Sequence, residues 1–218
     1  MRYTIEDVKK LGSILGIWAH PDDEAFVCAG LLIAAVSNGQ RVVLVTATKG
    51  GAGKSSDELK WPTANLADIR AKELEESLKF IGKIEHHWLG YQDGTLAESD
   101  ESEAVNKLVK IINKTRPDTV ITFEPDGITG HEDHKAVYRW AKEALNKSSV
   151  QSNLYCACEN TECYESCGRN LDAEHNIYFN CECPRLVSQD DADICFVLDG
   201  ETLKKKISCI KTHASQTE

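Results

Sequence analysis

Apolar residues along the chain follow two periods that alternate with each other. Continuous apolar runs, of the kind that form buried strands, lie at 13–19, 41–48, 84–90, 118–126 and 193–199. Segments with apolar residues at helical spacing lie at 22–38, 66–82, 101–115, 132–147 and 201–213. The alternation predicts right-handed βαβ units and therefore an α/β fold, a Rossmann-like three-layer sandwich around a mostly parallel sheet.

One stretch interrupts this alternation. Residues 155–184 hold six cysteines and no clear period, and we interpret them as a Cys-rich insertion. The insertion is expected to lie within a single domain that spans residues 1–218, because a chain of this length suits one domain with a buried core.

Charge and hydropathy limit the partners of the chain. The formal net charge is −10, and an acidic chain does not attract phosphate backbones, so we expect no nucleic-acid partner. No apolar run approaches the ~20 residues that a membrane-spanning helix needs. The first residues lack the basic and apolar regions of a signal peptide. These features predict a cytoplasmic protein.

The densest group of titratable residues follows the first predicted strand, in the sequence AHPDDE (19–24). His20 and Asp23 lie three residues apart across a turn that Pro21 constrains, so both can bind one metal ion. Zinc prefers such nitrogen and carboxylate ligands, and a catalytic zinc keeps one position open. The alternative is that the acidic residues only cap the next helix, where they interact favourably with the helix dipole.

A second motif, GHEDH (130–134), follows the fourth predicted strand. His131 and His134 lie three positions apart, at i and i+3, near a helix start, so they share one face. Taken alone, they are equally well explained as ordinary surface or core histidines. Ligands of parallel sheets bind beyond the carboxyl ends of the strands, so both motifs are expected at one edge. Together they predict a metal-dependent hydrolase.

The two motifs resemble those of the LmbE-like (PIG-L) N-acetylglucosaminyl deacetylases. The likeness covers most of residues 13–147, and RPDTVITFEPDGITGHEDHKAV is similar to the second motif block of that family. The resemblance implies a Zn²⁺-dependent hydrolase of a linear amide that removes an N-acetyl group from an N-acetylglucosamine-type substrate or conjugate. It also implies a homo-oligomer, a trimer or hexamer.

The resemblance also assigns roles to single residues. Asp22 would be the general base, His131 would stabilise the oxyanion, and Asp133 would orient His131. One departure is Glu132, which stands between these positions where the family commonly has proline. The implied zinc ligands are His20, Asp23 and His134. The implied substrate contacts are Arg70, Asp93 and, in a terminal HASQ sequence, His213.

Two alternatives compete with this interpretation. Residues Lys49–Ser55, KGGAGKS, match the deviant phosphate-binding loop of ParA/MinD-type ATPases. Such a loop should open directly into a helix, and Pro62 would break a helix there. We therefore favour a mobile Gly-rich loop beside the active site. The other alternative keeps the zinc hydrolase and gives it a different amide, as in thiol-conjugate amidases.

The clustered cysteines predict a second metal site. Thiolates at these spacings suit a structural Zn²⁺, and disulfides or free thiols are the alternatives in this part of the chain. The cluster consists of Cys156, Cys158, Cys163, Cys167, Cys181 and Cys183.

Overall fold

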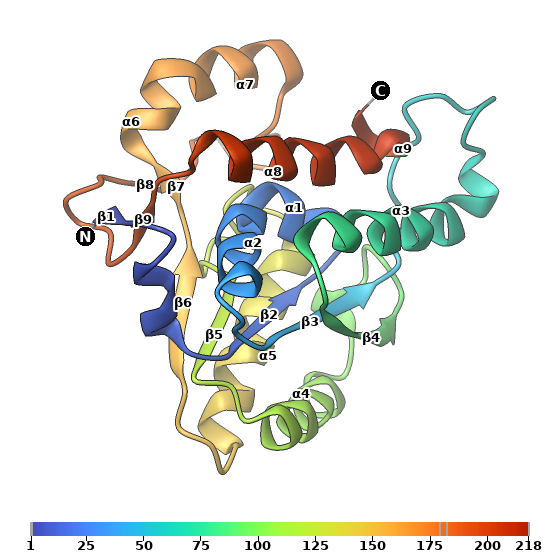
Figure 1. Cartoon of the computed structure of the whole chain (residues 1–218). Coiled ribbons are helices and arrows are strands. Elements are labelled where there is room, and N and C mark those ends of the chain that lie inside the picture. Colours follow the sequence, from blue (N-terminus) through green and yellow to red (C-terminus); the bar gives the residue numbers. More distant parts are fainter. Residues whose placement is uncertain (1, 179, 182, 218) are drawn as a thin grey trace.

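A five-stranded parallel sheet forms the centre of the computed structural model, which describes residues 2–178, 180–181 and 183–217 (Figure 1). Its strand order is β4-β3-β2-β5-β6, and every neighbouring pair is parallel. The strands are β2 (Ile14–Trp18), β3 (Val42–Thr48), β4 (Glu85–Tyr91), β5 (Thr119–Phe123) and β6 (Asn153–Ala157).

Helices cover both faces of this sheet, which makes the predicted α/β sandwich. On one face, α1 (Asp23–Val27), α2 (Ala29–Ser37) and α3 (Leu66–Ile81) pack beneath α8 (Gly200–Thr212). On the other face, α4 (Glu101–Thr115) packs against α5 (Glu132–Lys147), which contacts β2 and β5. Figure 1 shows α8 running across α1 to α3 and ending beside α9 (Ala214–Thr217).

The core lies where the central strands are covered on both faces. β2, β3 and β5 are buried along their whole length, which is why they form continuous apolar runs in the sequence. Trp18 and Phe123 are fully buried and pack edge to face across β2 and β5, with ring centroids 5.1 Å apart. This packing fixes the two strands whose carboxyl ends carry the two motifs.

The predicted elements differ from the structure in three places. The helix expected at 22–38 is two helices, because the backbone of Cys28 leaves helical geometry (φ −139°, ψ 7°). The strand expected at 193–199 is only β9 (Cys195–Phe196), which pairs with β1 (Arg2–Tyr3) outside the central sheet. Strand β6 does not emerge from the sequence pattern, because an edge strand that is only half-buried mixes polar and apolar residues.

The Cys-rich stretch therefore starts later than the sequence suggests. Cys156 belongs to β6 in the central sheet, and the irregular part begins only after this strand. Beyond it lie β7 (Glu159–Asn160), α6 (Thr161–Cys163), a π-helical turn (Tyr164–Gly168), α7 (Arg169–His175) and β8 (Leu186–Val187). Single 3₁₀ turns elsewhere span Asp7–Leu11, Thr63–Asn65 and Leu96–Glu98. None of the helices in the described part of the chain has the length and apolar character that crossing a membrane requires.

Candidate metal-dependent active site

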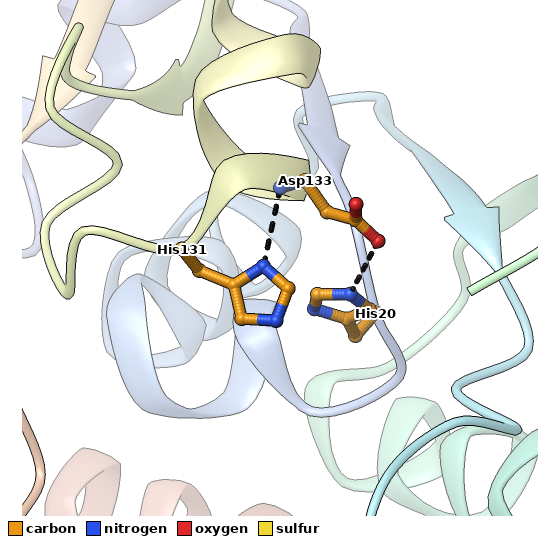
Figure 2. Close-up of side chains that lie close together, drawn as sticks. All are labelled: His20, His131 and Asp133. Carbon is orange, nitrogen blue, oxygen red and sulfur yellow. Dashed lines mark hydrogen bonds and ion pairs between the residues drawn. The ribbon is translucent and has the colours of Figure 1, made fainter. Parts of the chain in front are cut away.

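The two sequence motifs meet beyond the carboxyl ends of β2 and β5. The loop after β2 carries His20, and the N-terminal end of α5 carries His131 and Asp133 (Figure 2). His134 lies in the first turn of the same helix. In the order β4-β3-β2-β5-β6, the chain first adds β3 and β4 on one side of β2 and then β5 and β6 on the other side. This change of direction opens a crevice between β2 and β5. The Nδ1 atom of His20 lies 3.2 Å from Nε2 of His134 in this crevice. The predicted meeting of the two motifs is confirmed.

His20, Asp23 and His134 have donor atoms that converge on one point. Nε2 of His134 lies 3.3 Å from Oδ1 of Asp23, and Nδ1 of His20 lies 3.8 Å from Oδ2 of Asp23. Tetrahedral ligands that each lie 2.0–2.2 Å from zinc are about 3.3 Å from one another. The three residues are buried and their spacing fits this geometry, so they can bind a metal ion.

The outer nitrogen of each histidine has a partner that fixes the ring. Nδ1 of His134 lies 3.0 Å from the carbonyl oxygen of Gly127. Nε2 of His20 lies 2.9 Å from Oδ1 of Asp93 and 3.2 Å from Oδ2 of Asp133. These acceptors favour a proton on the outer nitrogen, so in the neutral ring the inner nitrogen has a lone pair directed at the centre and can bind a metal.

Gly127 is a functional residue that sequence reasoning missed. Its φ is +76°, and a Cβ atom there would lie 2.9 Å from Cβ of His134 and 3.1 Å from the carbonyl oxygen of His131. Only glycine therefore brings this backbone close enough to orient His134. The signal that could have found it is its place after β5, just ahead of the second motif.

The site carries an excess of negative charge that favours a cation. Burial acts to lower the pKa of His20, but hydrogen bonds to Asp133 and Asp93 outweigh burial and raise this pKa to about 10. Burial acts to raise the pKa of Asp23, but the charges of His134 and His20 hold it well below its usual range. The carboxylates of Asp23, Asp93 and Asp133 surround the His20 imidazole and stabilise positive charge there. A divalent metal ion would supply such a charge.

Asp22 lies beside these residues and takes no part in the convergent group. Its backbone is in the left-handed region (φ 112°), which is uncommon for a residue other than glycine. Its Oδ2 accepts a hydrogen bond from Nη2 of Arg70 at 3.0 Å. Burial raises the pKa of Asp22 to about 6, and the charge of Arg70 opposes this rise. A carboxylate with this pKa is ionised at neutral pH and can still accept a proton.

The comparison with known families decides how this geometry is classified. The pattern of the PIG-L family, described as GlcNAc-PI de-N-acetylase, matches residues 15–145. The chain belongs to this family. The match includes both motifs and the strands of the central sheet up to β5.

Two similar deacetylases agree with this assignment, and a third similar structure shares the fold alone. A 1D-myo-inositol 2-acetamido-2-deoxy-alpha-D-glucopyranoside deacetylase from Saccharomonospora viridis is 28% identical over 93% of this chain and 84% of its own length. The structure of an N,N'-diacetylchitobiose deacetylase from Pyrococcus horikoshii is 27% identical, with a TM-score of 0.66 over 95% of this chain and 72% of that one. A 4-carboxy-2-hydroxymuconate hydratase from Pseudomonas putida shares the fold at 17% identity, with a TM-score of 0.65 over 94% of this chain and 80% of that one.

Arg70 of this PIG-L family member is a positioning residue in the structure. Its guanidinium is buried and donates to the carbonyl oxygens of Gly50 (2.9 Å) and Pro21 (2.8 Å) as well as to Asp22. A Cβ atom at Gly50, which has a φ of +69°, would lie 2.4 Å from this guanidinium. The predicted substrate contact is therefore engaged by the protein, and it holds Asp22 in place.

The Gly-rich loop Lys49–Ser55 does not have the geometry of a phosphate-binding loop. Two of its amides already have side-chain partners, because Gly50 donates to Oγ1 of Thr48 and Ala52 donates to Oδ2 of Asp93. The helix that follows, α3, begins only at Leu66, after a 3₁₀ turn. The nucleotide-binding alternative is therefore not supported. The loop instead packs against the guanidinium of Arg70.

The side chains of Asp133 and Asp93 also contact protein groups of the site. The Asp133 carboxylate lies against His20, and the described contact with His131 is the Asp133 backbone N–H, which donates to Nδ1 of that ring at 3.1 Å (Figure 2). Asp133 thus contacts His131 through its backbone amide, and the orienting role expected for it stays a prediction. Asp93, predicted as a substrate contact, has a side chain that is 8% exposed and lies against His20.

His213 is not placed to touch a substrate. Its side chain is fully buried, and its Nε2 lies 3.7 Å from Oε1 of Glu24, which is also fully buried. The residues after it tie α9 to the rest of the molecule: Ser215 donates to Glu73 of α3, and Gln216 donates to the carbonyl oxygen of Lys54. The HASQ sequence is therefore a structural clamp, which corrects the predicted role of His213.

The predicted second metal site is not supported by the arrangement of the cysteines. In residues 2–178, 180–181 and 183–217, every cysteine is a free thiol, and no three of these sulfurs lie within ligand distance of one another. Cys163 and Cys167 are exposed on the helical segment, whereas Cys156 and Cys158 face a cavity next to the active site. The sequence spacing of the cysteines does not show that one pair lies on the outer surface and the other pair lines a cavity.

Proposed function

We propose that this chain is a zinc-dependent hydrolase that removes the N-acetyl group from an N-acetylglucosamine-type substrate or conjugate. The observation that carries the proposal is the convergence of His20, Asp23 and His134 at zinc-ligand spacing beside an ionisable Asp22. Membership of the GlcNAc-PI de-N-acetylase family supports the reaction. The deacetylases from S. viridis and P. horikoshii, both named for acetylated amino sugars, support the substrate class.

Zinc fits the donor set better than the harder cations. Two imidazole nitrogens with one carboxylate oxygen suit zinc, whereas magnesium and calcium prefer sites made of oxygen alone. Three protein ligands also leave a fourth position for water or substrate. A zinc ion held by these residues would supply Lewis acidity at the amide carbonyl and would lower the pKa of water from about 15.7 to near 7.

Asp22 is the proton carrier in the proposed reaction. Its carboxylate is ionised at neutral pH, so it can accept the proton of the attacking water. Once protonated, it can return this proton to the amine nitrogen as the C–N bond breaks. Arg70 holds Asp22 in one orientation and keeps its pKa from rising further. Without Arg70, burial alone would favour the protonated form, which cannot act as a base.

His131 supports the developing oxyanion. Its Nδ1 accepts the backbone N–H of Asp133, so in the neutral ring the proton is on Nε2. Burial, followed by the charges of His20 and His134, lowers the pKa of His131 and favours this neutral ring. The Nε2–H group then donates to the carbonyl oxygen as it gains charge. Such a preorganised donor typically contributes ~10²–10³ in rate.

The test combines activity with metal content on the same samples. We expect purified wild type to contain one zinc per chain and to release acetate from at least one member of a panel of N-acetylglucosamine conjugates. His20→Ala should lose both properties, whereas the matched variant His87→Ala, which changes a half-buried histidine of β4, should keep both. A zinc-loaded wild type that releases no acetate from any panel member would contradict the proposal.

A further inference from the structure

A cavity of 1050 Å³ reaches the proposed metal ligands from the side of β5 and β6. Asp23 and His134 belong to its lining, which also includes residues of α1, α2, β6 and the Cys-rich stretch after β6. Pockets that enclose whole drug-sized ligands measure roughly 300–1,000 Å³. The space is therefore much larger than an acetyl group requires.

The free surface of this cavity is mainly apolar. Side chains such as Phe26, Leu31, Ile121, Leu154 and Phe196 line it. Cys156 and Cys158 belong to the same surface, and burial raises the pKa of both thiols, so they are uncharged at neutral pH. Buried neutral cysteines behave as small hydrophobic residues.

Several polar groups of the lining already have protein partners. Arg185 lies 3.2 Å from Oε1 of Glu124, and the hydroxyl of Tyr178 donates to Glu159 at 2.8 Å. The ammonium of Lys206 donates to the carbonyl oxygen of Phe26 at 2.7 Å. A sugar needs hydrogen-bond partners for each hydroxyl that it buries, and these groups are already engaged with the protein. An alkyl chain needs none.

The position of Asp22, the proposed proton carrier, indicates which part of the substrate enters the cavity. The cavity is lined by Asp23 and His134, whereas Asp22, His131 and Arg70 are absent from its described lining. The leaving nitrogen must face Asp22 to receive its proton. The other substituent of the carbonyl carbon, which is the acyl chain, then points away from Asp22 and toward the cavity.

We propose that the cavity is an acyl-chain site, and that this enzyme hydrolyses the amide bond of amino sugars whose linear N-acyl group is longer than acetyl. The inference rests on the proposed hydrolase function and extends its substrate class. The reaction needs only water: the carbonyl carbon gains oxygen from water, the C–N bond breaks, and a fatty acid and an amine with the transferred proton are released.

Two matched substrate series test the direction of the chain. One series lengthens the acyl group of N-acyl-glucosamine from acetyl to octanoyl, and the other adds the same methylenes as an alkyl glycoside of N-acetylglucosamine. We expect kcat/KM to rise about fourfold per methylene in the first series, as each methylene leaves water, and to stay flat in the second. A rise only in the glycoside series, or a fall with acyl length, overturns the acyl-chain site. Absence of turnover in both series, including acetyl, counts against the hydrolase itself.

A filled-cavity variant provides a second readout. Leu154→Trp on β6 should remove the preference for octanoyl over acetyl while acetyl turnover persists, and Leu171→Trp, on an exposed face of α7, should change neither. An octanoyl preference that survives in folded Leu154→Trp overturns the proposal.

Thiol protection tests the site without turnover and without a filled cavity. N-octanoyl-glucosamine bound to the Asp22→Asn variant should slow alkylation of Cys156 and Cys158, read by mass spectrometry, whereas the exposed thiols of Cys163 and Cys167 should react at an unchanged rate. Equal protection by the octyl glycoside, or no protection by either compound, contradicts the assignment.

Discussion

The Asp133 carboxylate lies 3.2 Å from Nε2 of His20, on the ring nitrogen that faces away from the proposed metal. Two backbone amides hold this carboxylate, because Gly94 donates to Oδ2 at 2.8 Å and Leu96 donates to Oδ1 at 3.0 Å. Asp133 is almost fully buried, so it has little freedom to move. The turn after β4 thus fixes a carboxylate on α5, and that carboxylate fixes a histidine after β2.

Asp133→Asn should weaken metal binding more than it changes the fold. The amide keeps the shape and one acceptor oxygen, but it loses the negative charge that supports the outer N–H of His20. We expect an affinity for zinc that is about 10–100-fold lower, measured by competition with a chelator of known affinity. Glu132→Gln, a change at the neighbouring exposed residue, is the control and should bind zinc as wild type does. Equal affinities in the two variants would refute the orienting role.

Asp22→Asn should separate catalysis from metal binding. Asparagine tolerates the left-handed backbone found at this position, so the loop after β2 should keep its conformation. The variant lacks a basic carboxylate, and we expect kcat to fall by ~10²–10⁴ while the zinc content stays at the wild-type level. Metal analysis and steady-state kinetics on one preparation provide the measurement. A variant with wild-type kcat would show that another group accepts the proton.

The parts of the site that could be predicted from sequence are those set by local pattern. Strand and helix periods indicate the sheet, and parallel strands present ligands at their carboxyl ends, which brings His20 and His134 together. This step requires only that each motif directly follows a strand of one sheet, whatever the conformation of the residues between them. The edge strand β6 escapes prediction because half-burial weakens the apolar period that identifies a strand.

The parts that could not be predicted depend on contacts between distant segments. Arg70 and Asp93 belong to the site, but only the folded chain shows that protein groups already bind their polar atoms. The same holds for His213, whose complete burial follows from the packing of α8 and α9 against α3. A sequence motif shows which chemical group stands at a position. It does not show which distant segment of the chain that group contacts.

Removal of the metal should lower the thermal stability. Without a cation, the buried carboxylates of Asp23, Asp93 and Asp133 are balanced by the charges of His20 and His134. A ligand present at 1,000 times its Kd stabilises a folded protein by about 4 kcal/mol, and a chain of this size gains about 2–4 °C per kcal/mol. We therefore expect a chelator to lower Tm by about 8–16 °C, as followed by circular dichroism, and added zinc to restore it. His20→Ala should show no such chelator effect, and a Tm of wild type that ignores the chelator would argue against a bound metal.

His86 should make the fold sensitive to mild acid, independently of the active site. Burial, followed by the charge of His87, lowers the pKa of His86 to about 4, and its Nε2 lies 2.9 Å from Oγ1 of Thr46. In the unfolded chain this pKa is about 6.5, so the unfolded state binds more protons between these values. The stability that neutral His86 provides is therefore complete above pH 6.5 and is lost as the pH falls toward 4. Between pH 7 and 5 the loss is about 2 kcal/mol of unfolding free energy. Urea denaturation at both pH values should show a smaller loss in His86→Gln than in wild type or in His87→Gln, and identical losses in all three proteins would exclude His86 as the cause.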